Sequence, residues 1–232
     1  MERLHNGFTL ELSAGAFPLS TDSVALSGFV KLPRGATVLD LGSGCGTLGL
    51  LLCARFPDCA VTGIELDRDA HLTALENAAR NDLSGHLNSI CADLNQIPQL
   101  IPPGSFCCCV SNPPYFSAGF KSRTHPLARN DAGCSLDTLF SAAAWALKYG
   151  GDFFLVHKPE RLAELFAKAT ENGLEPKRLC LLRHRAGDPV SLVLIQCRKG
   201  GKPGLLWEEE SLFDPNGNPT QYYRKLYHME EQ

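Results

Sequence analysis

A glycine-rich turn between a buried strand and a helix is the feature that most constrains this fold. Residues 37–41 form a short β-branched and apolar run, residues 42–46 contain three glycines, and residues 47–56 form an apolar segment that ends at Pro57. This order predicts a buried strand followed directly by a helix. Glycine lets the backbone approach a ligand closely, and the start of a helix offers unpaired amides. The turn therefore predicts a site for a nucleotide-like ligand.

Strands and helices alternate along most of the chain. Strands are expected at 37–41, 60–65, 86–91, 106–111, 152–157, 174–183 and 190–198, and helices at 20–29, 47–56, 67–81, 136–147 and 159–172. Such alternation predicts a parallel sheet with helices on both faces, and the tight link at 186–189 predicts an antiparallel hairpin at its end. We therefore expect an α/β fold with a mixed, mostly parallel, seven-stranded sheet.

The length of 232 residues fits one domain, or one domain with an appendage. Residues 1–35 are expected to be an N-terminal segment of that domain and residues 36–198 its core. The periodic pattern is lost after the glycine-rich stretch at 200–204, so residues 199–232 are expected to form a C-terminal extension. Neither a signal peptide nor the roughly 20 apolar residues of a membrane span is apparent. We expect a cytoplasmic protein, monomeric and without membrane contact.

Charge and cysteine content exclude two classes of protein. The 22 Lys and Arg against 25 Asp and Glu give a net charge of −3, which excludes a strongly basic protein that coats nucleic acid and leaves room for a local basic patch. The 10 cysteines include no CxxC pair, so the spacing of a zinc ribbon is absent. We expect buried free thiols in a reducing compartment and no metal.

Three acidic residues follow successive predicted strands: Asp40, Glu65 and Asp93. Gly44, Gly46 and Gly49 also fit the glycine pattern of dinucleotide-binding proteins, with Glu65 about 20 residues further on. Asp40, however, precedes the first glycine, where a carboxylate suits a positive amino group and is badly placed beside a pyrophosphate. The three acids together favour the amino-acid end, the ribose and the adenine of one zwitterionic ligand. An NAD(P)-binding oxidoreductase remains the alternative from another class.

The segment Asn112–Pro113–Pro114–Tyr115 ends the fourth predicted strand. Its prolines remove two backbone donors and stiffen the chain. The side-chain carbonyl of Asn112 and the backbone carbonyl of Pro113 can then accept both N–H bonds of a planar amino group, while Tyr115, with Phe116, stacks on the base. Such a grip localises the nitrogen lone pair, and positioning supplies much of the catalysis. The segment defines the chemistry of the acceptor and leaves its identity open.

These motifs resemble those of class I S-adenosylmethionine-dependent methyltransferases over residues 36–198. VLDLGSGCG is similar to their first motif, IELD to the ribose-binding segment and CADL to the adenine-binding segment. The resemblance implies a Rossmann-like fold and an S-adenosyl-L-methionine cofactor. It implies that Asp40, Gly42 and Gly44 line the methionine end, that Glu65 binds the ribose hydroxyls, and that Asp93 and the Leu94 amide bind the adenine. Leu66, next to Glu65, is also expected to contact the cofactor. The NPPY segment resembles that of N6-adenine methyltransferases and of glutamine methyltransferases of release factors.

Flanking segments resemble one family among these, the bacterial valine-tRNA (adenine-N6)-methyltransferases. Residues 17–26 fit its pattern F-x-x-[ST]-x-D-[ASG]-V-x-L, and residues 211–227 are similar to its C-terminal end. The resemblance implies N6-methylation of an adenine in tRNA, in the anticodon loop. It adds Thr21 and Asp22 to the cofactor-binding residues. The positive charges of Lys121, Arg123 and Arg129 lie in the segment that follows the NPPY motif, so we expect them to bind the nucleic acid together with Phe116.

At two positions the chain departs from the family's usual residues. The family usually has Ala-Arg-His-Glu where this chain has Ala128-Arg129-Asn130-Asp131, which leaves the roles of Asn130 and Asp131 open. We expect no N-terminal helical domain of the release-factor type, which favours tRNA over the alternative substrate, a glutamine of a protein. A second basic cluster is Lys177, Arg178, Arg183, His184 and Arg185. It forms either part of an RNA-binding stripe or scattered solubilising charge.

Overall fold

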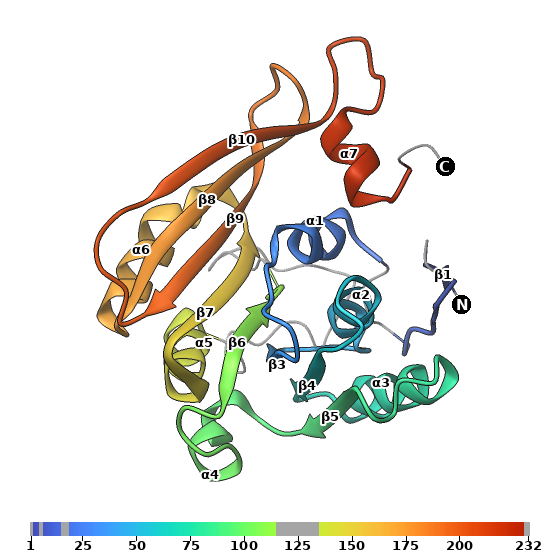
Figure 1. The fold of residues 1–232 in the computed structure, drawn as a ribbon, viewed down its shortest axis with the longest axis vertical. Coiled ribbons are helices and arrows are strands. Elements are labelled where there is room, and N and C mark those ends of the chain that lie inside the picture. Colours follow the sequence, from blue (N-terminus) through green and yellow to red (C-terminus); the bar gives the residue numbers. More distant parts are fainter. Residues whose placement is uncertain (1, 5–6, 15–18, 115–134, 230–232) are drawn as a thin grey trace.

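A computed structural model describes residues 2–4, 7–14, 19–114 and 135–229, and a twisted central sheet organises them (Figure 1). Its strands are β3 (Thr37–Leu41), β4 (Ala60–Glu65), β5 (Leu87–Cys91), β6 (Phe106–Ser111), β7 (Leu147–His157), β8 (Leu174–Arg185), β9 (Val190–Lys199) and β10 (Leu206–Phe213). The strand order is β10-β8-β9-β7-β6-β3-β4-β5. In this sheet β9 runs antiparallel to both neighbours, and the other adjacent pairs are parallel. The mixed, mostly parallel α/β fold is confirmed.

The described sheet has eight strands rather than the expected seven, because β10 joins it at the edge beside β8. Three consecutive glutamates, residues 208–210, obscure this strand in the sequence, since glutamate is depleted in strands. An edge strand tolerates such charges. Two of them are neutralised from β8: Arg178 pairs with Glu208 at 3.1 Å and Arg183 with Glu209 at 2.7 Å.

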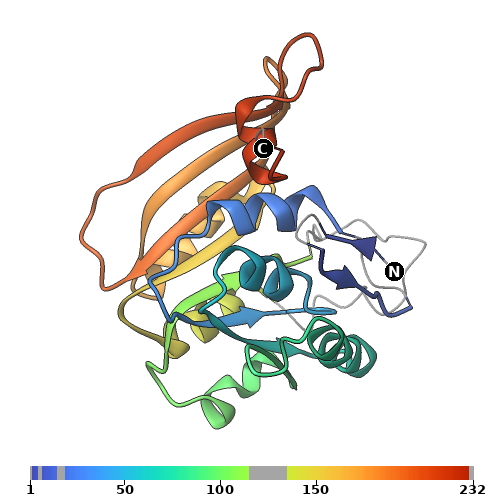
Figure 2. The ribbon, with the colours of Figure 1, turned by 45° about the vertical axis from the view of Figure 1, so that its right-hand side comes forward.

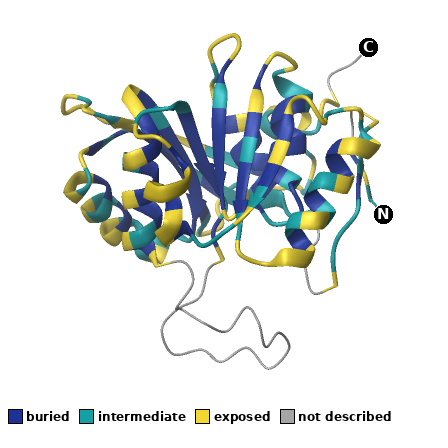
Figure 3. Cartoon of the chain, turned by 90° about the horizontal axis from the view of Figure 1, so that it is seen from below, coloured by how far each residue is buried: buried dark blue, intermediate teal, exposed yellow. Residues whose placement is uncertain are grey.

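Helices cover both faces of the sheet, as expected. They are α1 (Thr21–Phe29), α2 (Thr47–Arg55), α3 (Arg68–Arg80), α4 (Ile97–Leu100), α5 (Leu136–Ala146), α6 (Leu162–Glu171) and α7 (Gln221–Leu226), with the 3-10 helices η1 (Leu94–Gln96) and η3 (Pro159–Arg161). One core cluster joins α1, α2 and α7 to one face, and the other joins α4, α5 and α6 to the opposite face. Figure 3 shows the strands buried between helices whose outer sides are exposed.

The N-terminal residues are tied to this fold through α3. The strands β1 (Glu2–Arg3) and β2 (Thr9–Leu10) form a small hairpin. Asn81 accepts a hydrogen bond from the Thr9 amide, and Asn77 accepts one from the Glu11 amide, both at 2.8 Å. The hairpin therefore lies against α3 beside the glycine turn. None of the helices within the described ranges is long and apolar enough to cross a membrane.

Candidate functional site

The carboxyl ends of β6, β3, β4 and β5 lie next to one another and bring most of the predicted residues to one edge of the sheet. Asp40 of β3 is in register with Gly63 of β4 and with Val110 of β6. Glu65 ends β4, beside Cys91 at the end of β5. Asn112 follows β6 directly, and Asp93 lies two residues after the end of β5. Ligands of open α/β sheets bind at this edge.

The glycine turn is held against the end of β4. The amides of Gly42 and Ser43 both donate to the carbonyl of Ile64, at 3.0 and 3.1 Å. Gly42 and Gly44 have φ values of 77° and 54°, which place them in the left-handed region that glycine adopts without strain. The turn then leads into α2 through Gly46, the residue that precedes the helix. Its glycines are therefore required by the backbone conformation itself.

Asp40 is buried beneath this turn with 2% of its surface exposed. Burial, and secondly the negative charge of Glu65, raise the pKa of its carboxyl to about 7. Its Oδ2 atom has no hydrogen-bond partner among the described residues, and the same holds for the hydroxyl of Ser43 in the turn. Buried polar atoms without partners are costly. A ligand that brings an ammonium group to Asp40 would remove this cost, whereas a pyrophosphate would increase it.

Glu65 links the glycine turn to the start of α3. Its Oε2 atom accepts a hydrogen bond from the Gly44 amide at 2.7 Å, and its Oε1 atom accepts one from the Asp67 amide at 2.8 Å. Each carboxylate oxygen can still accept a second bond, so the group can also bind ligand hydroxyls. Leu66 beside it has 57% of its surface exposed. An apolar side chain next to this carboxylate suits a flat, weakly polar ligand surface.

Asp93, which lies after β5 on the same edge of the sheet, caps a short helix. It caps η1: its Oδ1 atom accepts from the Asn95 amide and side chain, both at 2.8 Å, and its own amide donates to Gln96 Oε1 at 3.2 Å. The Leu94 side chain is buried beneath it. The cap fixes the backbone of both residues at the strand end, so the Asp93 carboxylate serves as a cap even without a ligand.

Asn112 is joined to the first turn of α1. Its Nδ2 atom donates to the hydroxyl of Ser23 at 2.9 Å. Thr21 and Asp22 lie in the same turn, half-buried, so the predicted N-terminal residues and Asn112 come from neighbouring segments. Pro113 is buried and Pro114 is exposed. Sequence reasoning missed Ser23, because nothing in its local pattern distinguishes it from other buried serines.

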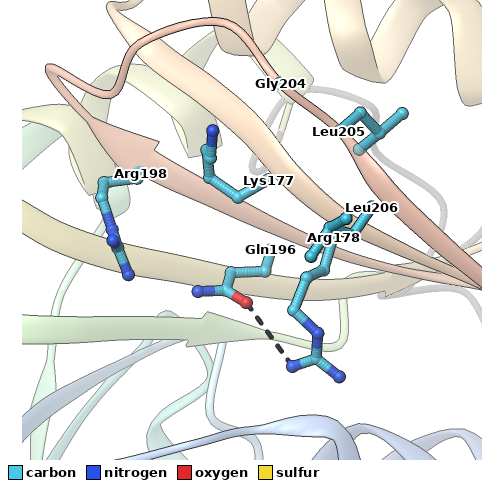
Figure 4. Close-up of a pocket in the computed structure, with 7 residues that line it drawn as sticks. All are labelled: Lys177, Arg178, Gln196, Arg198, Gly204, Leu205 and Leu206. Carbon is cyan, nitrogen blue, oxygen red and sulfur yellow. Dashed lines mark hydrogen bonds between the residues drawn. The ribbon is translucent and has the colours of Figure 1, made fainter.

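The predicted residues Tyr115, Phe116, Lys121, Arg123 and Arg129 lie outside the described residues, as do Asn130 and Asp131. The second basic cluster is divided along β8, with Lys177 and Arg178 in the first half of the strand and residues 183–185 at its end. Arg178 and Arg183 are five residues apart, which is about 16 Å along a strand at 3.3 Å per residue. The first part borders a surface pocket at the end of β8 remote from the acids (Figure 4). The cluster is therefore not one continuous patch.

Comparison with known proteins identifies the family. The methyltransferase small domain family matches residues 21–171. A tRNA1(Val) (adenine(37)-N6)-methyltransferase of Photobacterium profundum is 30% identical over 182 residues, which cover 77% of this chain and 76% of that protein. The enzyme of the same name from Aeromonas hydrophila is 31% identical over 188 residues, covering 80% and 78%.

Solved structures show the same fold. A predicted O-methyltransferase from Agrobacterium tumefaciens superimposes with a TM-score of 0.75 at 20% identity, covering 90% of this chain and 96% of that one. A TehB-like S-adenosylmethionine-dependent methyltransferase from Corynebacterium glutamicum gives 0.54 at 18% identity, covering 78% and 89%. These likenesses confirm the Rossmann-like methyltransferase fold. The chain therefore belongs to the methyltransferase small domain family.

Proposed function

We propose that the protein transfers a methyl group from S-adenosylmethionine to the exocyclic N6 amine of an adenine in tRNA. The observation that carries the proposal is the placement of Asn112, oriented by Ser23, on the same sheet edge as the buried Oδ2 of Asp40, which has no hydrogen-bond partner among the described residues. Asn112 suits a planar amino group, and Asp40 suits a cationic cofactor. The names of the relatives point to adenine 37 of a valine tRNA, in the anticodon loop.

The cofactor supplies a methyl group carried on a positively charged sulfur. In the proposed site, Asp40 and the glycine turn of Gly42 and Gly44 would hold its amino-acid end, because no described residue supplies a hydrogen bond to the buried Oδ2 atom of Asp40. Glu65 binds the ribose hydroxyls with the lone pairs that Gly44 and Asp67 leave available. The adenine ring of the cofactor would lie against Leu66 and would be bound by Asp93 and the Leu94 amide. Thr21 and Asp22 close the site from α1.

Asn112 and Pro113 hold the acceptor. The Ser23 hydroxyl accepts a hydrogen bond from Nδ2 of Asn112. Because Nδ2 faces α1, the Oδ1 atom of the same amide is directed away from that helix. Oδ1 and the Pro113 carbonyl accept the two N–H bonds of the adenine amine, which localises the nitrogen lone pair toward the methyl donor. No strong base is needed first, because the proton leaves the positively charged product afterwards. Pro114 stiffens the segment, and Tyr115 stacks on the base.

We further propose that residues 36–198 form the catalytic core of a monomer in the cytoplasm, with Phe116, Lys121, Arg123 and Arg129 contacting tRNA. The nine cysteines within the described ranges are free thiols, most of them buried, which suits a reducing compartment.

The test is methyl transfer from labelled S-adenosylmethionine into unmodified tRNA, with nucleosides of the digested product identified by mass spectrometry. We expect N6-methyladenosine at one position, and we expect Asn112→Ala to abolish it while S-adenosylhomocysteine still binds in calorimetry. Label in a release-factor glutamine and none in RNA would replace the proposal with protein methylation. Calorimetric binding of NAD in place of S-adenosylhomocysteine would overturn it altogether.

A further inference from the structure

Four aromatic rings from three elements form a continuous row, which we call the aromatic row. His184 lies at the end of β8, Phe213 at the end of β10, Tyr223 on α7, and Tyr227 directly after that helix as its C-terminal cap. The ring centroids are 5.1 Å apart from His184 to Phe213, 5.0 Å from Phe213 to Tyr223 and 4.4 Å from Tyr223 to Tyr227. The last pair is stacked, with 28° between the ring planes.

The aromatic row leads to the candidate site. The Tyr227 hydroxyl lies beside that of Thr21, the first residue of α1. Two residues further along the same helix, the hydroxyl of Ser23 accepts a hydrogen bond from the side-chain amide of Asn112. Figures 1 and 2 show α7 beside α1 in both views, at the far end of β10. The row thus begins next to the acceptor-binding segment and runs outward to the tip of the β8–β9 hairpin.

Phe213, Tyr223 and Tyr227 pack against the core on one side, yet none of these rings is fully buried. Helix α7 is fixed by Leu226, which is 3% exposed in the core, and by Arg55 of α2, whose guanidinium donates to the Leu226 carbonyl at 2.6 Å. Tyr223 and Tyr227 remain half-buried, and His184 is exposed. The row therefore offers ring surface to solvent on the side of the molecule where the acceptor binds.

Positive charges border the aromatic row. Arg224 and Lys225 are exposed in the last turn of α7, and Arg185 is exposed beside the β10–α7 turn. None of the three lies within ion-pair distance of a carboxylate in the described ranges. Asp214, the acid that opens that turn, is bound by Asn216 and Asn218 of the turn itself. The cations thus remain available to phosphates.

Exposed rings bordered by cations are the means by which proteins hold unpaired nucleotides. A base that leaves a loop to reach Asn112 also exposes the faces of its neighbours. We propose that the aromatic row stacks on the nucleotides next to the target adenine and that Arg185, Arg224 and Lys225 contact their phosphates. This inference rests on the proposed function, because it names the part of the protein that grips the same RNA.

The first test compares Tyr223→Leu with Tyr149→Leu, a control at an 82% exposed tyrosine near the opposite ends of the strands. We expect Tyr223→Leu to raise the KM for tRNA roughly tenfold, while the affinity for S-adenosylhomocysteine and the kcat at saturating tRNA are kept. Tyr223→Trp keeps an aromatic ring at this position and removes the hydroxyl, so it should keep the KM near that of the wild type. If the hydroxyl had a structural role instead, the KM of Tyr223→Trp would rise as well. Tyr149→Leu should leave the KM unchanged.

The second test uses salt. Substituting Arg224→Gln and Lys225→Gln together should lower the slope of log Kd for tRNA against log salt by about 1.4, since each phosphate contact on a single strand contributes about 0.7. Lys148→Gln with Lys202→Gln, at exposed positions away from the row, should leave the slope unchanged.

The outcomes separate the two proposals. A wild-type protein that methylates no tRNA contradicts the proposed function. Methylation of tRNA with an unchanged KM in Tyr223→Leu, or an equal rise in Tyr149→Leu, overturns the aromatic row alone.

Discussion

Asn112 donates to the hydroxyl of Ser23 at 2.9 Å, a hydrogen bond between residues 89 positions apart in the sequence. It joins the segment after β6 to the first turn of α1 and determines which end of the Asn112 amide faces outward. An amide that can rotate presents its NH2 group as often as its oxygen, and only the oxygen can accept a bond from an amine. We therefore regard Ser23 as a positioning residue for the proposed reaction.

Ser23→Ala should lower kcat roughly tenfold, because it removes the partner that orients Asn112 and costs about one hydrogen bond, ~1.4 kcal/mol. The affinity for S-adenosylhomocysteine should stay near that of the wild type. Steady-state kinetics and calorimetry give the two quantities.

Ser27→Ala is the matched control, since Ser27 is buried in the same helix and its hydroxyl donates to the Val24 carbonyl and accepts from Arg55, without a hydrogen bond to Asn112. Equal losses of kcat in both variants would attribute the effect to the stability of α1. The double variant Ser23→Ala with Asn112→Ala should lose no more than Asn112→Ala alone, because the two residues act as one unit.

Cofactor binding should depend on pH through Asp40. In the free protein its carboxyl has a pKa of about 7, and only the carboxylate pairs with an ammonium group. Below that pKa, binding must release a proton, so the affinity for S-adenosylhomocysteine should rise as pH increases from 5.5 to 7, by at most about tenfold per pH unit. Calorimetry across this range measures the slope, and Asp40→Asn should bind weakly with little slope. A slope of the same size in Asp40→Asn would assign it to another group.

Asp40 should also make the protein without cofactor less stable at higher pH. The folded protein holds the Asp40 proton up to a pKa of about 7, compared with 3.8 for an ordinary aspartate. The stability linked to this group is therefore fully present below about pH 4 and is lost as pH rises through 7. Asp40→Asn should exceed the wild type in free energy of unfolding at pH 8 by up to about 4 kcal/mol. Urea denaturation at pH 5 and pH 8 tests this, and a difference that does not grow with pH contradicts it.

Most of the fold follows from local sequence pattern, and the exceptions have physical causes. Buried strands such as residues 106–111 are recognised because every position in them is apolar or small. Strand β10 is not recognised from its local sequence. Its glutamates Glu208 and Glu209 are compatible with a strand because Arg178 and Arg183 of the neighbouring β8 form ion pairs with them. A local pattern carries no information about a neighbour that arrives from another part of the chain.

The candidate site divides in the same way. The order of strands and acids places Asp40, Glu65 and Asp93 on one edge, because parallel strands bring their carboxyl ends together. The hydrogen bonds that occupy Glu65 and the bond between Ser23 and Asn112 depend on tertiary packing. The sequence thus predicts which residues meet, and the structure adds which atoms are already engaged.

Glu65→Gln should weaken S-adenosylhomocysteine binding roughly thirtyfold. Both carboxylate oxygens accept backbone amides, from Gly44 and Asp67, and a glutamine must turn its NH2 group toward one of these donors. A hydrogen bond to a charged acceptor contributes about 2 kcal/mol, so losing one loosens the glycine turn. Glu76→Gln, at an exposed position of α3, is the control for removal of a charge. Calorimetry that finds equal affinities for both variants would show that the Glu65 bonds do not hold the turn for the cofactor.

Gly63 should be required for the position of Ser43. A Cβ atom at Gly63 would meet the side chain of Ser43, whose amide is bound to Ile64 at the end of β4. Gly63→Ala should displace the glycine turn and raise the Kd for S-adenosylhomocysteine roughly tenfold, because overpacking costs about 1–3 kcal/mol. Adding Ser43→Gly removes the atoms that the new Cβ meets, so the double variant should recover most of the affinity despite carrying two changes. Recovery of binding in calorimetry would assign the loss to this one contact, whereas a double variant weaker than Gly63→Ala would show that the alanine disturbs β4 itself.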